Sequence, residues 1–423
     1  MKLYKHQKQA LKEAEGCNRV AFYHDMGLGK TFTGSEKLIQ LGAKANLIIC
    51  QKTKVNDWLD HFIENYDVTP FDLTSKDEYT GCFKAISEGF NVYGVINYEL
   101  AFRRPKLLEL TDFTLLLDES SMIQNETAKQ SKFALKLGEK AANVILLSGT
   151  PTGGKYERLW SQLHLLGWNI SKKMYWNQYV NVEYLDALGR SIPVVTGYKN
   201  VERLKRKMRE YGCQFLKTED VMSLPEQNFI TERVKPTKEY KAFHKNGIVS
   251  VNDVELIGDT TLTKMLYERE LCGMYSADKL QAFKDLIEST EDRLVVFYNF
   301  NDELTALMQI VNACERQFGV VNGKTKNPEI IAAEGAILFV QYQAGAMGLN
   351  LQNANKIIYF TPPLSSELYE QSKKRIHRIG QKKPCFYYQL IVKGSIEEKI
   401  YKTLAKRQDY TEKLFKKESG VEQ

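Results

Sequence analysis

The feature that most constrains the fold is a glycine-rich turn between a short apolar run and a helical segment. The apolar run covers residues 20–23, the turn reads HDMGLGKT over residues 24–31, and residues 32–40 have the pattern of a helix. Glycines let the backbone turn so that successive N–H groups face inward, and a helix start adds the positive end of its dipole. A strand, a glycine loop and a helix in this order predict a phosphate-binding loop.

Each residue of the turn has an expected role. Gly27 and Gly29 allow the turn, Lys30 can reach the outer phosphates of a nucleotide, and Thr31 offers its hydroxyl to a magnesium ion. His24 stands where the full G-x-x-x-x-G-K-T pattern has its first glycine, so the match is partial. The alternative is a glycine turn at a helix start with a solvated lysine.

Length and composition limit the class of protein. A chain of 423 residues is expected to form two or three domains, and 43% hydrophobic with 26% charged residues is a globular composition. The net charge of +7 is compatible with a polyanion partner without requiring one. Seven cysteines without a C-x-x-C pair indicate free thiols rather than a zinc or disulfide framework. With no long apolar run, we expect a soluble, cytoplasmic protein that does not contact a membrane.

Four further apolar runs predict more strands of one sheet. They lie at residues 47–50, 92–96, 114–117 and 144–147. Each is continuous rather than alternating, as expected of strands buried on both faces. With the strand before the glycine loop they predict a parallel sheet flanked by helices, with ligands at the carboxyl ends of its strands.

An acidic pair follows the third of these runs. Burying Asp118 and Glu119 at a strand end is costly unless a cation or a proton transfer requires them. Asp118 would hold magnesium, and Glu119 would orient and deprotonate an attacking water. The alternative is a helix N-cap. Near the start of the chain, the Gln7 amide could pair with an adenine edge, or it could be a surface glutamine.

Residues 155–275 read as mainly helical. Their tryptophans and tyrosines could form a platform for bases, although packing onto the first domain is the expected role. The basic run at residues 199–209 could follow a phosphate backbone or form a solvated helix face.

The α/β pattern restarts at Ser276, with strands expected at residues 293–298, 336–340, 356–360 and 386–392. The stretch QSKKRIHRIGQ, residues 371–381, would place Arg375 and Arg378 on one face of a helix. The planar guanidinium suits the binding of phosphate oxygens, and the alternative is a basic helix patch. The end of the chain is expected to form a helix of mixed charge.

These motifs, in this order, resemble those of the Snf-type (chromatin-remodeller-like) ATPases and DNA translocases of helicase superfamily two. DMGLGKT resembles their DEMGLGKT, DESSMIQN their D-E-A-H-R-I-K-N, and LSGTPT their L-T-G-T-P. QAGAMGLNLQNA resembles A-G-G-x-G-L-N-L-x-x-A, and QSKKRIHRIGQ resembles Q-A-x-x-R-x-H-R-x-G-Q. Ser120 and Ser121 replace the Ala-His pair, whose histidine helps to couple hydrolysis to the motif around residues 148–151.

The resemblance implies an α/β fold of two RecA-like lobes, each a parallel sheet flanked by helices, plus a mainly helical insertion. We expect lobe one at residues 1–154, the insertion and crossing at 155–275, lobe two at 276–400, and a C-terminal helix at 401–423. ATP with Mg²⁺ would bind between the lobes.

The resemblance also implies roles for particular residues. The expected catalytic residues are Lys30, Asp118, Glu119, Arg375 and Arg378, the two arginines acting as arginine fingers. The expected ATP contacts are Gln7, Gly27, Gly29, Lys30, Thr31 and Gly348. The expected metal ligands are Thr31 and Asp118. The expected coupling and nucleic-acid contacts are Ser148, Thr150, Asn350 and Gln371.

We therefore expect an ATP hydrolase that translocates on double-stranded DNA as a monomeric engine. One alternative is a strand-separating helicase on DNA or RNA, although no strand-splitting hairpin is evident in the sequence. A second alternative, from outside the enzymes, is an ATP-gated nucleic-acid clamp. A two-lobe engine without a reader domain suggests a bacterial, viral or mobile-element origin, and a viral protein would act in the host cytoplasm.

Overall fold

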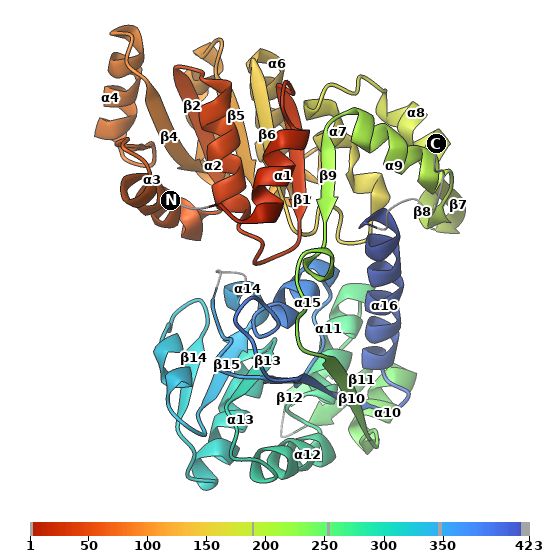
Figure 1. Cartoon of the computed structure of the whole chain (residues 1–423). Helices are drawn as coiled ribbons and strands as arrows, with labels where there is room; N and C mark the ends of the chain where they lie inside the picture. The colour runs from red at the N-terminus through yellow and green to blue at the C-terminus, as the bar shows by residue number, and fades with distance from the viewer. Residues whose placement is uncertain (1–2, 188–189, 252–253, 346–348, 416–423) are drawn as a thin grey trace. The chain divides into compact units, whose positions relative to one another are not determined.

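The computed structural model describes residues 3–415, apart from 188–189, 252–253 and 346–348 (Figure 1). The chain divides into two compact units, one formed by Met1–Met222 with Asp409–Gln423 and the other by Ser223–Gln408. Within the described ranges, no helix is both long and apolar enough to cross a membrane.

Unit one is built on a parallel sheet that has seven strands in the described part of the chain, in the order β3-β4-β2-β5-β6-β1-β9. Five of these strands coincide with the predicted apolar runs. The strands are β1 (Arg19–His24), β2 (Ala45–Cys50), β3 (Phe71–Asp72), β4 (Val92–Asn97), β5 (Thr114–Asp118), β6 (Asn143–Leu147) and β9 (Cys213–Leu216).

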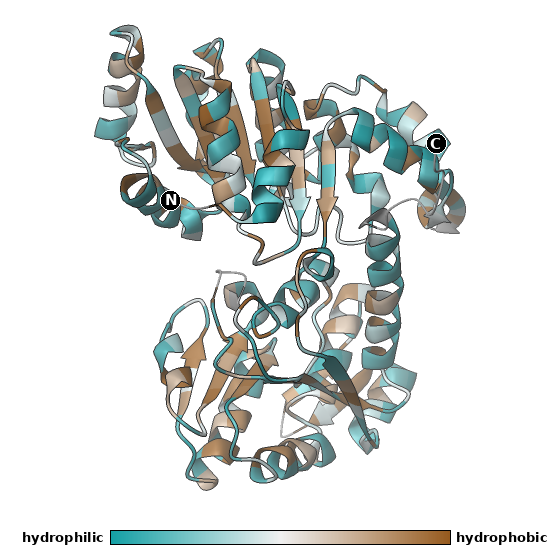
Figure 2. Ribbon diagram, in the orientation of Figure 1, coloured by the Kyte–Doolittle hydropathy of each residue, from teal (hydrophilic) through white to brown (hydrophobic). Residues whose placement is uncertain are grey.

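Helices cover both faces of this sheet because successive strand residues point to opposite sides. In β5, Leu116 belongs to one apolar cluster, whereas Leu115 and Leu117 belong to the other. The central strands are correspondingly hydrophobic over their middle residues (Figure 2). The first face packs against α1 (Lys5–Glu13), α2 (Lys30–Leu41) and α3 (Val55–Asn65). The second packs against α4 (Lys76–Ser87), α5 (Tyr98–Ala101), α6 (Lys129–Lys140), α7 (Trp160–Leu165), α8 (Lys172–Tyr179) and α9 (Val201–Glu210).

Unit two repeats the plan with a second parallel sheet, six strands among the described residues, in the order β10-β17-β16-β13-β15-β14. Its strands are β10 (Gln227–Val234), β13 (Leu294–Tyr298), β14 (Phe318–Val321), β15 (Ile337–Gln341), β16 (Lys356–Tyr359) and β17 (Cys385–Val392). Its helices are α10 (Lys238–Asn246), α11 (Thr261–Cys272), α12 (Ala277–Glu288), α13 (Asn301–Ala313), α14 (Tyr342–Gly345), α15 (Ser366–Lys373) and the first turns of α16 (Ile396–Phe415). The two RecA-like lobes predicted from the sequence are confirmed.

The segment predicted as a mainly helical insertion is distributed between the two units. Its strand β9 completes the first sheet beside β1, and its strand β10 forms an edge of the second. It also contains two antiparallel hairpins, β7 (Val180–Ala187) with β8 (Arg190–Tyr198), and β11 (Ile248–Val251) with β12 (Val254–Ile257). Edge strands such as β10 are only half-buried, and they lack the continuous apolar runs that identified the central strands.

Candidate functional site

The glycine loop after β1 has the geometry of a phosphate-binding turn. Gly27 and Gly29 have φ angles of 85° and 72°, in the left-handed region that glycine adopts without strain. Gly29 is the N-cap of α2, and the N–H groups of the first turn of a helix have no acceptor within the helix itself, which leaves them for a ligand. The Lys30 ammonium donates hydrogen bonds to the carbonyl oxygens of His24 at 2.9 Å and Asp25 at 3.4 Å, which places the positive charge inside the turn.

Gln7 lies under this loop, with only 2% of the residue exposed. Its amide Nε2 donates to the carbonyl oxygen of Gly29 at 3.0 Å, and its Oε1 accepts from the Tyr4 N–H at 2.8 Å. A Cβ atom at position 29 would lie 2.5 Å from that Nε2 atom. Gln7 is therefore not a surface glutamine but a support of the loop, and its contact with adenine stays a prediction.

Two side chains that precede the glycines shape the loop further. The Asp25 Oδ2 accepts from the Thr218 hydroxyl at 2.9 Å, and its Oδ1 accepts from the Met26 N–H at 3.0 Å. His24 is 1% exposed, and burial, with the charge of Lys30, lowers its pKa to about 3. The imidazole is consequently neutral, and Lys30 carries the positive charge of the loop.

Asp118 is held in place at the end of β5. Its Oδ2 accepts from the Trp58 indole N–H at 2.8 Å, and its backbone carbonyl accepts from the Tyr98 hydroxyl at 2.9 Å. Its Oδ1 accepts the N–H of Glu119, which has a left-handed φ of 51°. The 3₁₀ turn that follows, Ser120–Ile123, receives no side-chain capping bond from Glu119, its N-cap residue.

Glu119 is the half-buried acid of the site. Its Oε1 accepts from the Ser148 hydroxyl at 2.6 Å and from the Ser121 hydroxyl at 3.2 Å. Burial raises the pKa of Glu119, and the charge of Lys30 and the bond from Ser148 oppose that rise. A half-buried carboxyl group whose pKa is raised, within the influence of a lysine charge, is the environment of a general base.

The segment that follows β6 lies against both the Glu119 carboxyl group and the Lys30 ammonium group. Ser148 accepts from the Thr150 N–H at 3.2 Å in addition to donating to Glu119. A Cβ atom at Gly149 would lie 3.2 Å from the Lys30 Nζ, so the backbone approaches the lysine closely. The Thr150 hydroxyl is buried and has no hydrogen-bond partner among the described residues.

The donor atoms fit magnesium. Thr31 and Asp118 offer a hydroxyl and a carboxylate, and Mg²⁺ prefers oxygen ligands and usually keeps several waters beside one or two protein groups and substrate phosphates. Within its described ranges the structure has no group of three or more His, Cys, Asp or Glu side chains that could hold a metal ion. Bound there, the cation would neutralise phosphate charge.

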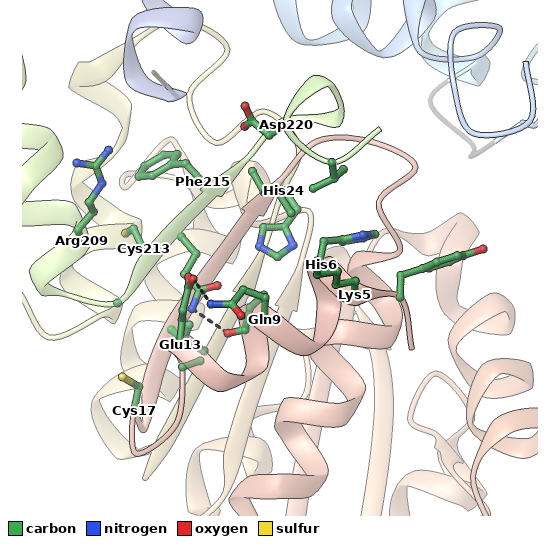
Figure 3. A pocket seen from close by; sticks show the side chains of 18 of the residues that line it. Lys5, His6, Gln9, Glu13, Cys17, His24, Arg209, Cys213, Phe215 and Asp220 are labelled. Atoms are coloured by element: carbon green, nitrogen blue, oxygen red, sulfur yellow. Dashed lines mark hydrogen bonds between the residues drawn. The ribbon is translucent and has the colours of Figure 1, made fainter. Parts of the chain in front are cut away.

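A cavity of about 1070 Å³ adjoins the loop, between α1, the end of β1 and β9 (Figure 3). Tyr4 and His6 stack at 5.7 Å between ring centroids, and the His6 Nε2 lies 3.0 Å from the carbonyl oxygen of Leu28 in the loop. The buried Nδ1 of His24 has no hydrogen-bond partner among the described residues. The volume is sufficient for a nucleoside.

In unit two, the arginine motif does not form the continuous helix that was predicted for it. Helix α15 ends at Lys373, so Arg375 and Arg378 lie in the turn that follows and do not share a helix face. Gln381 fixes this turn, because its Nε2 donates to three carbonyl oxygens, those of Gln352, Ala354 and Ile376. Arg375 is 7% exposed, and burial lowers the pKa of Arg378.

The other predicted residues of unit two are spread along the chain. Gln371 is buried in α15, and its Oε1 has no hydrogen-bond partner among the described residues. Asn350 is exposed in a loop. Gly348 lies outside the described residues.

The structure tests the prediction for the aromatic segment of unit one but not the prediction for its basic segment. Trp168, Tyr175 and Tyr179 belong to the apolar core of the sheet, so the expectation of packing is confirmed. In α9, Lys205 is buried and pairs with Glu202 at 3.0 Å, whereas three of its arginines are exposed: Arg203, Arg206 and Arg209. A role for that exposed face in phosphate binding stays a prediction.

Sequence reasoning did not identify Trp58, Gln162 or Thr218 as site residues. Each contacts a motif residue that is at least 40 positions away, and hydrogen bonds over such separations leave no local pattern. Gln162 is fully buried, and it joins the segments that follow β5 and β6.

Two family models match most of the chain. The model of the SNF2-related domain matches residues 6–282, and that of the helicase conserved C-terminal domain matches residues 278–380. The chain is 22% identical to the mouse SWI/SNF-related matrix-associated actin-dependent regulator of chromatin subfamily A member 1, over 89% of this chain and 39% of that protein. It is 26% identical to the yeast DNA repair and recombination protein RAD26, over 75% of this chain and 32% of that protein.

Similarity extends to an uncharacterized ATP-dependent helicase of Mycoplasma genitalium, 22% identical over 71% of this chain and 30% of that protein. The chain therefore spans about a third of the length of these relatives. Among solved structures, the Sulfolobus solfataricus SWI2/SNF2 ATPase core in complex with dsDNA covers 97% of this chain and 92% of its own, with 18% identity and a TM-score of 0.44.

Proposed function

Because the chain belongs to the SNF2-related domain family, we propose that it hydrolyses ATP and uses the energy to translocate along double-stranded DNA. The observation that carries the proposal is the meeting of three motifs at the carboxyl edge of the first sheet. The Lys30 ammonium lies inside the glycine loop, and the Glu119 carboxyl accepts from Ser148 at 2.6 Å. A cation for phosphates and a base near it are the groups that nucleotide hydrolysis requires.

The proposed roles in unit one follow from these positions. Lys30 neutralises the outer phosphates of ATP, and the loop N–H groups at the start of α2 bind their oxygens. Thr31 and Asp118 hold Mg²⁺. Glu119 takes the proton of the attacking water, and its raised pKa suits a base that works near neutral pH.

We propose further that unit two supplies Arg375 and Arg378 to the phosphates, because guanidinium groups stabilise the charge that develops in phosphoryl transfer. Gln371 and Asn350 are the proposed coupling and nucleic-acid contacts of this unit. Nucleic acid would be held mainly through its phosphates, so binding would show little sequence preference and a strong dependence on salt.

Double-stranded DNA is the proposed substrate because the relatives that share most of this chain are named for chromatin regulation and for DNA repair and recombination. The first test is the steady-state ATPase rate without polymer and with duplex DNA, single-stranded DNA or RNA. We expect duplex DNA to give the strongest stimulation. Preference for a single strand or RNA would contradict the proposal, and so would the absence of any stimulation.

Substitutions of the site residues test whether these residues carry out the ATP hydrolysis. Lys30→Ala should abolish DNA-stimulated turnover, whereas Lys44→Ala, an exposed lysine between α2 and β2, should retain it. Glu119→Gln should lower turnover by about 100-fold or more and retain nucleotide binding, because the base contributes to chemistry rather than to affinity. If Glu119→Gln turned over ATP at the wild-type rate, the ATP-gated clamp would become the better account of the protein.

A strand-separating helicase is the second candidate, and the β7–β8 hairpin favours it. The hairpin exposes four large apolar side chains, those of Tyr184, Leu185, Ile192 and Val194. An exposed apolar hairpin could separate the strands of a duplex by stacking against a base pair. Unwinding of a tailed duplex that is lost in Tyr184→Ala would support this candidate, and displacement of a triplex strand without unwinding would support translocation.

A further inference from the structure

Gln162 is a fully buried polar side chain that contacts the ends of three strands at the site. Its Nε2 donates to the carbonyl oxygen of Pro151 at 2.7 Å, and its Oε1 accepts from the Ser120 hydroxyl at 2.8 Å and the Tyr23 hydroxyl at 3.0 Å. Pro151 comes after β6, Ser120 after β5, and Tyr23 lies in β1 immediately before the glycine loop. One amide therefore joins all three motif-bearing segments.

We propose that Gln162 is a positioning residue that couples the catalytic turn at Glu119 to the segment of residues 148–151. The inference rests on the proposed function, because it concerns how hydrolysis is passed from this site to bound DNA. Gln162 makes its contacts from α7, a helix that supplies none of the predicted catalytic residues.

Two hydrogen-bonded connections, which we call ties, join the acidic turn that contains Glu119 and Ser120 to residues 148–151. The two ties differ in their chemistry. The direct tie is the bond from the Ser148 hydroxyl to the Glu119 carboxyl group, whose strength depends on whether that group is ionised. The second tie runs from Ser120 through Gln162 to Pro151. The second tie is formed by a neutral amide with a hydroxyl and a carbonyl group, and it does not involve the Glu119 carboxyl group.

The geometry makes the second tie stiff. Ser120, Gln162 and Tyr23 are each 0% exposed, so no water replaces a lost partner without a local rearrangement. The proline ring fixes φ at position 151, which restricts how the carbonyl oxygen of that residue can move. A displacement of the acidic turn is thus transmitted to Pro151.

The partners of Gln162 also decide which variants are informative. Gln162→Met keeps a side chain of similar length and removes both amide atoms. Ser120→Ala cuts the same tie from its other end and leaves the Tyr23 hydroxyl on the amide oxygen. The matched control is Ser161→Ala, because Ser161 neighbours Gln162 in α7, is 1% exposed and has no hydrogen-bond partner for its hydroxyl among the described residues.

The experiment measures ATP turnover with and without saturating duplex DNA, together with triplex displacement per ATP hydrolysed. In Gln162→Met and Ser120→Ala we expect the ratio of stimulated to unstimulated turnover to fall at least about fivefold, the equivalent of one lost buried hydrogen bond. Displacement per ATP should fall as well. Ser161→Ala should match the wild type in both measurements. The double variant Gln162→Met with Ser120→Ala should be no worse than the more affected single variant, since both changes cut one tie.

Thermal melting and nucleotide binding, measured on every variant, separate loss of coupling from loss of fold. If a folded, nucleotide-binding Gln162→Met protein kept the stimulation ratio of Ser161→Ala, the inference would be overturned while the proposed function stood. If wild-type turnover did not respond to duplex DNA, the proposed function itself would fail. If Gln162→Met failed to fold, the stimulation ratio of Ser120→Ala would test the inference instead, because this change removes only a hydroxyl group.

Discussion

The indole N–H of Trp58 donates a hydrogen bond of 2.8 Å to the Oδ2 atom of Asp118, from a helix 60 residues earlier in the chain. Trp58 is 1% exposed in α3, so its ring cannot move without disturbing the core. The bond fixes the orientation of the carboxyl group that is expected to hold magnesium. Loss of a partner that orients a metal ligand typically lowers metal affinity or activity by about 10- to 100-fold.

Trp58→Phe should therefore weaken the response to Mg²⁺. The change keeps a large aromatic ring and removes the N–H donor, so the Mg²⁺ concentration for half-maximal ATPase activity should rise about tenfold. The control is Trp160→Phe, because the Trp160 indole donates at 2.8 Å to the carbonyl oxygen of Ile170, away from the site. An unchanged Mg²⁺ requirement in Trp58→Phe would contradict the orienting role.

Two glycines of α2 offer a matched pair of substitutions. Gly29 and Gly42 stand at the two ends of the helix with φ of 72° and 65°, so alanine is strained at both, by roughly 1 kcal/mol. At Gly29 the new Cβ would also lie 2.5 Å from the Gln7 amide, whereas at Gly42 nothing lies within 4 Å. Gly29→Ala should bind ATP at least about tenfold more weakly, which is equivalent to the loss of one contact in the loop. Gly42→Ala should bind ATP as tightly as the wild type. Titration with a fluorescent nucleotide measures the affinity of each variant. Equal affinities for Gly29→Ala and Gly42→Ala would show that the Gln7 side chain moves aside to accommodate the new methyl group.

Ser148→Ala should shift the pH dependence of ATP turnover. The Ser148 hydroxyl lowers the pKa of Glu119, so its removal raises that pKa further. If Glu119 acts as the base, the enzyme loses activity as pH falls through this pKa, and in Ser148→Ala that acidic limb should move to higher pH. Ser131→Ala is the control, because the Ser131 hydroxyl in α6 is buried with no hydrogen-bond partner in the described part of the chain. An unmoved acidic limb would argue against Glu119 as the titrating base.

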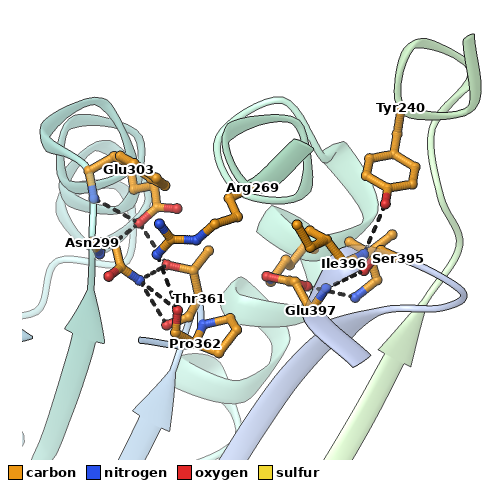
Figure 4. Close-up of polar contacts among 12 residues, drawn as sticks. Tyr240, Arg269, Asn299, Glu303, Thr361, Pro362, Ser395, Ile396 and Glu397 are labelled. Atoms are coloured by element: carbon orange, nitrogen blue, oxygen red, sulfur yellow. Dashed lines mark hydrogen bonds and ion pairs between the residues drawn. The ribbon is translucent and has the colours of Figure 1, made fainter. Parts of the chain in front are cut away.

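Glu303 in unit two should make the fold less stable as pH rises. The carboxyl group is 0% exposed and accepts from the Asn299 and Phe300 N–H groups and from the Thr361 hydroxyl (Figure 4). Burial raises its pKa to about 7, although the charge of Lys279 opposes the rise. The native state thus binds more protons than the unfolded chain between pH 4.5 and 7, so stability falls as pH rises through this window, by roughly 3 kcal/mol.

Glu303→Gln isolates this effect. The amide keeps the size of the side chain and does not titrate, so the loss of stability between pH 4.5 and 7 should become smaller. Glu397, which pairs with Lys279 at 2.6 Å, also has a raised pKa from burial, and its contribution of the same sign should persist in the variant. Thermal melting across this pH range measures both, and identical pH profiles for variant and wild type would refute the assignment to Glu303.

The sequence was a good guide wherever chemistry or burial repeats over a short stretch. The runs ending at Tyr23, Ile96 and Leu147 are strands because both faces of each are buried, and that condition selects continuous apolar residues. The glycine loop was equally visible, since only glycine adopts its φ angles without strain. Edge strands such as β10 escaped prediction, because half-buried residues leave a mixed pattern.

The arginine motif shows where a local pattern misleads. Its spacing is compatible with a helix, yet α15 ends at Lys373, before Arg375 and Arg378. The competing contacts come from outside the segment: the Gln381 amide binds the carbonyl oxygens of Gln352 and Ala354, and the imidazole of His377 lies 2.8 Å from the carbonyl oxygen of Pro225. Helix periodicity contains no information about such partners.

What the sequence by itself determined is the set of chemical groups and the strands that carry them, because strand ends, glycine turns and acidic pairs are local features. Only the tertiary structure decided which groups support one another. Gln7 under Gly29, Trp58 on Asp118 and Gln162 between Ser120 and Pro151 are pairings over long separations. They arise because the parallel sheet brings the carboxyl ends of distant strands to one edge, where a buried polar atom must find its partner in space rather than in sequence.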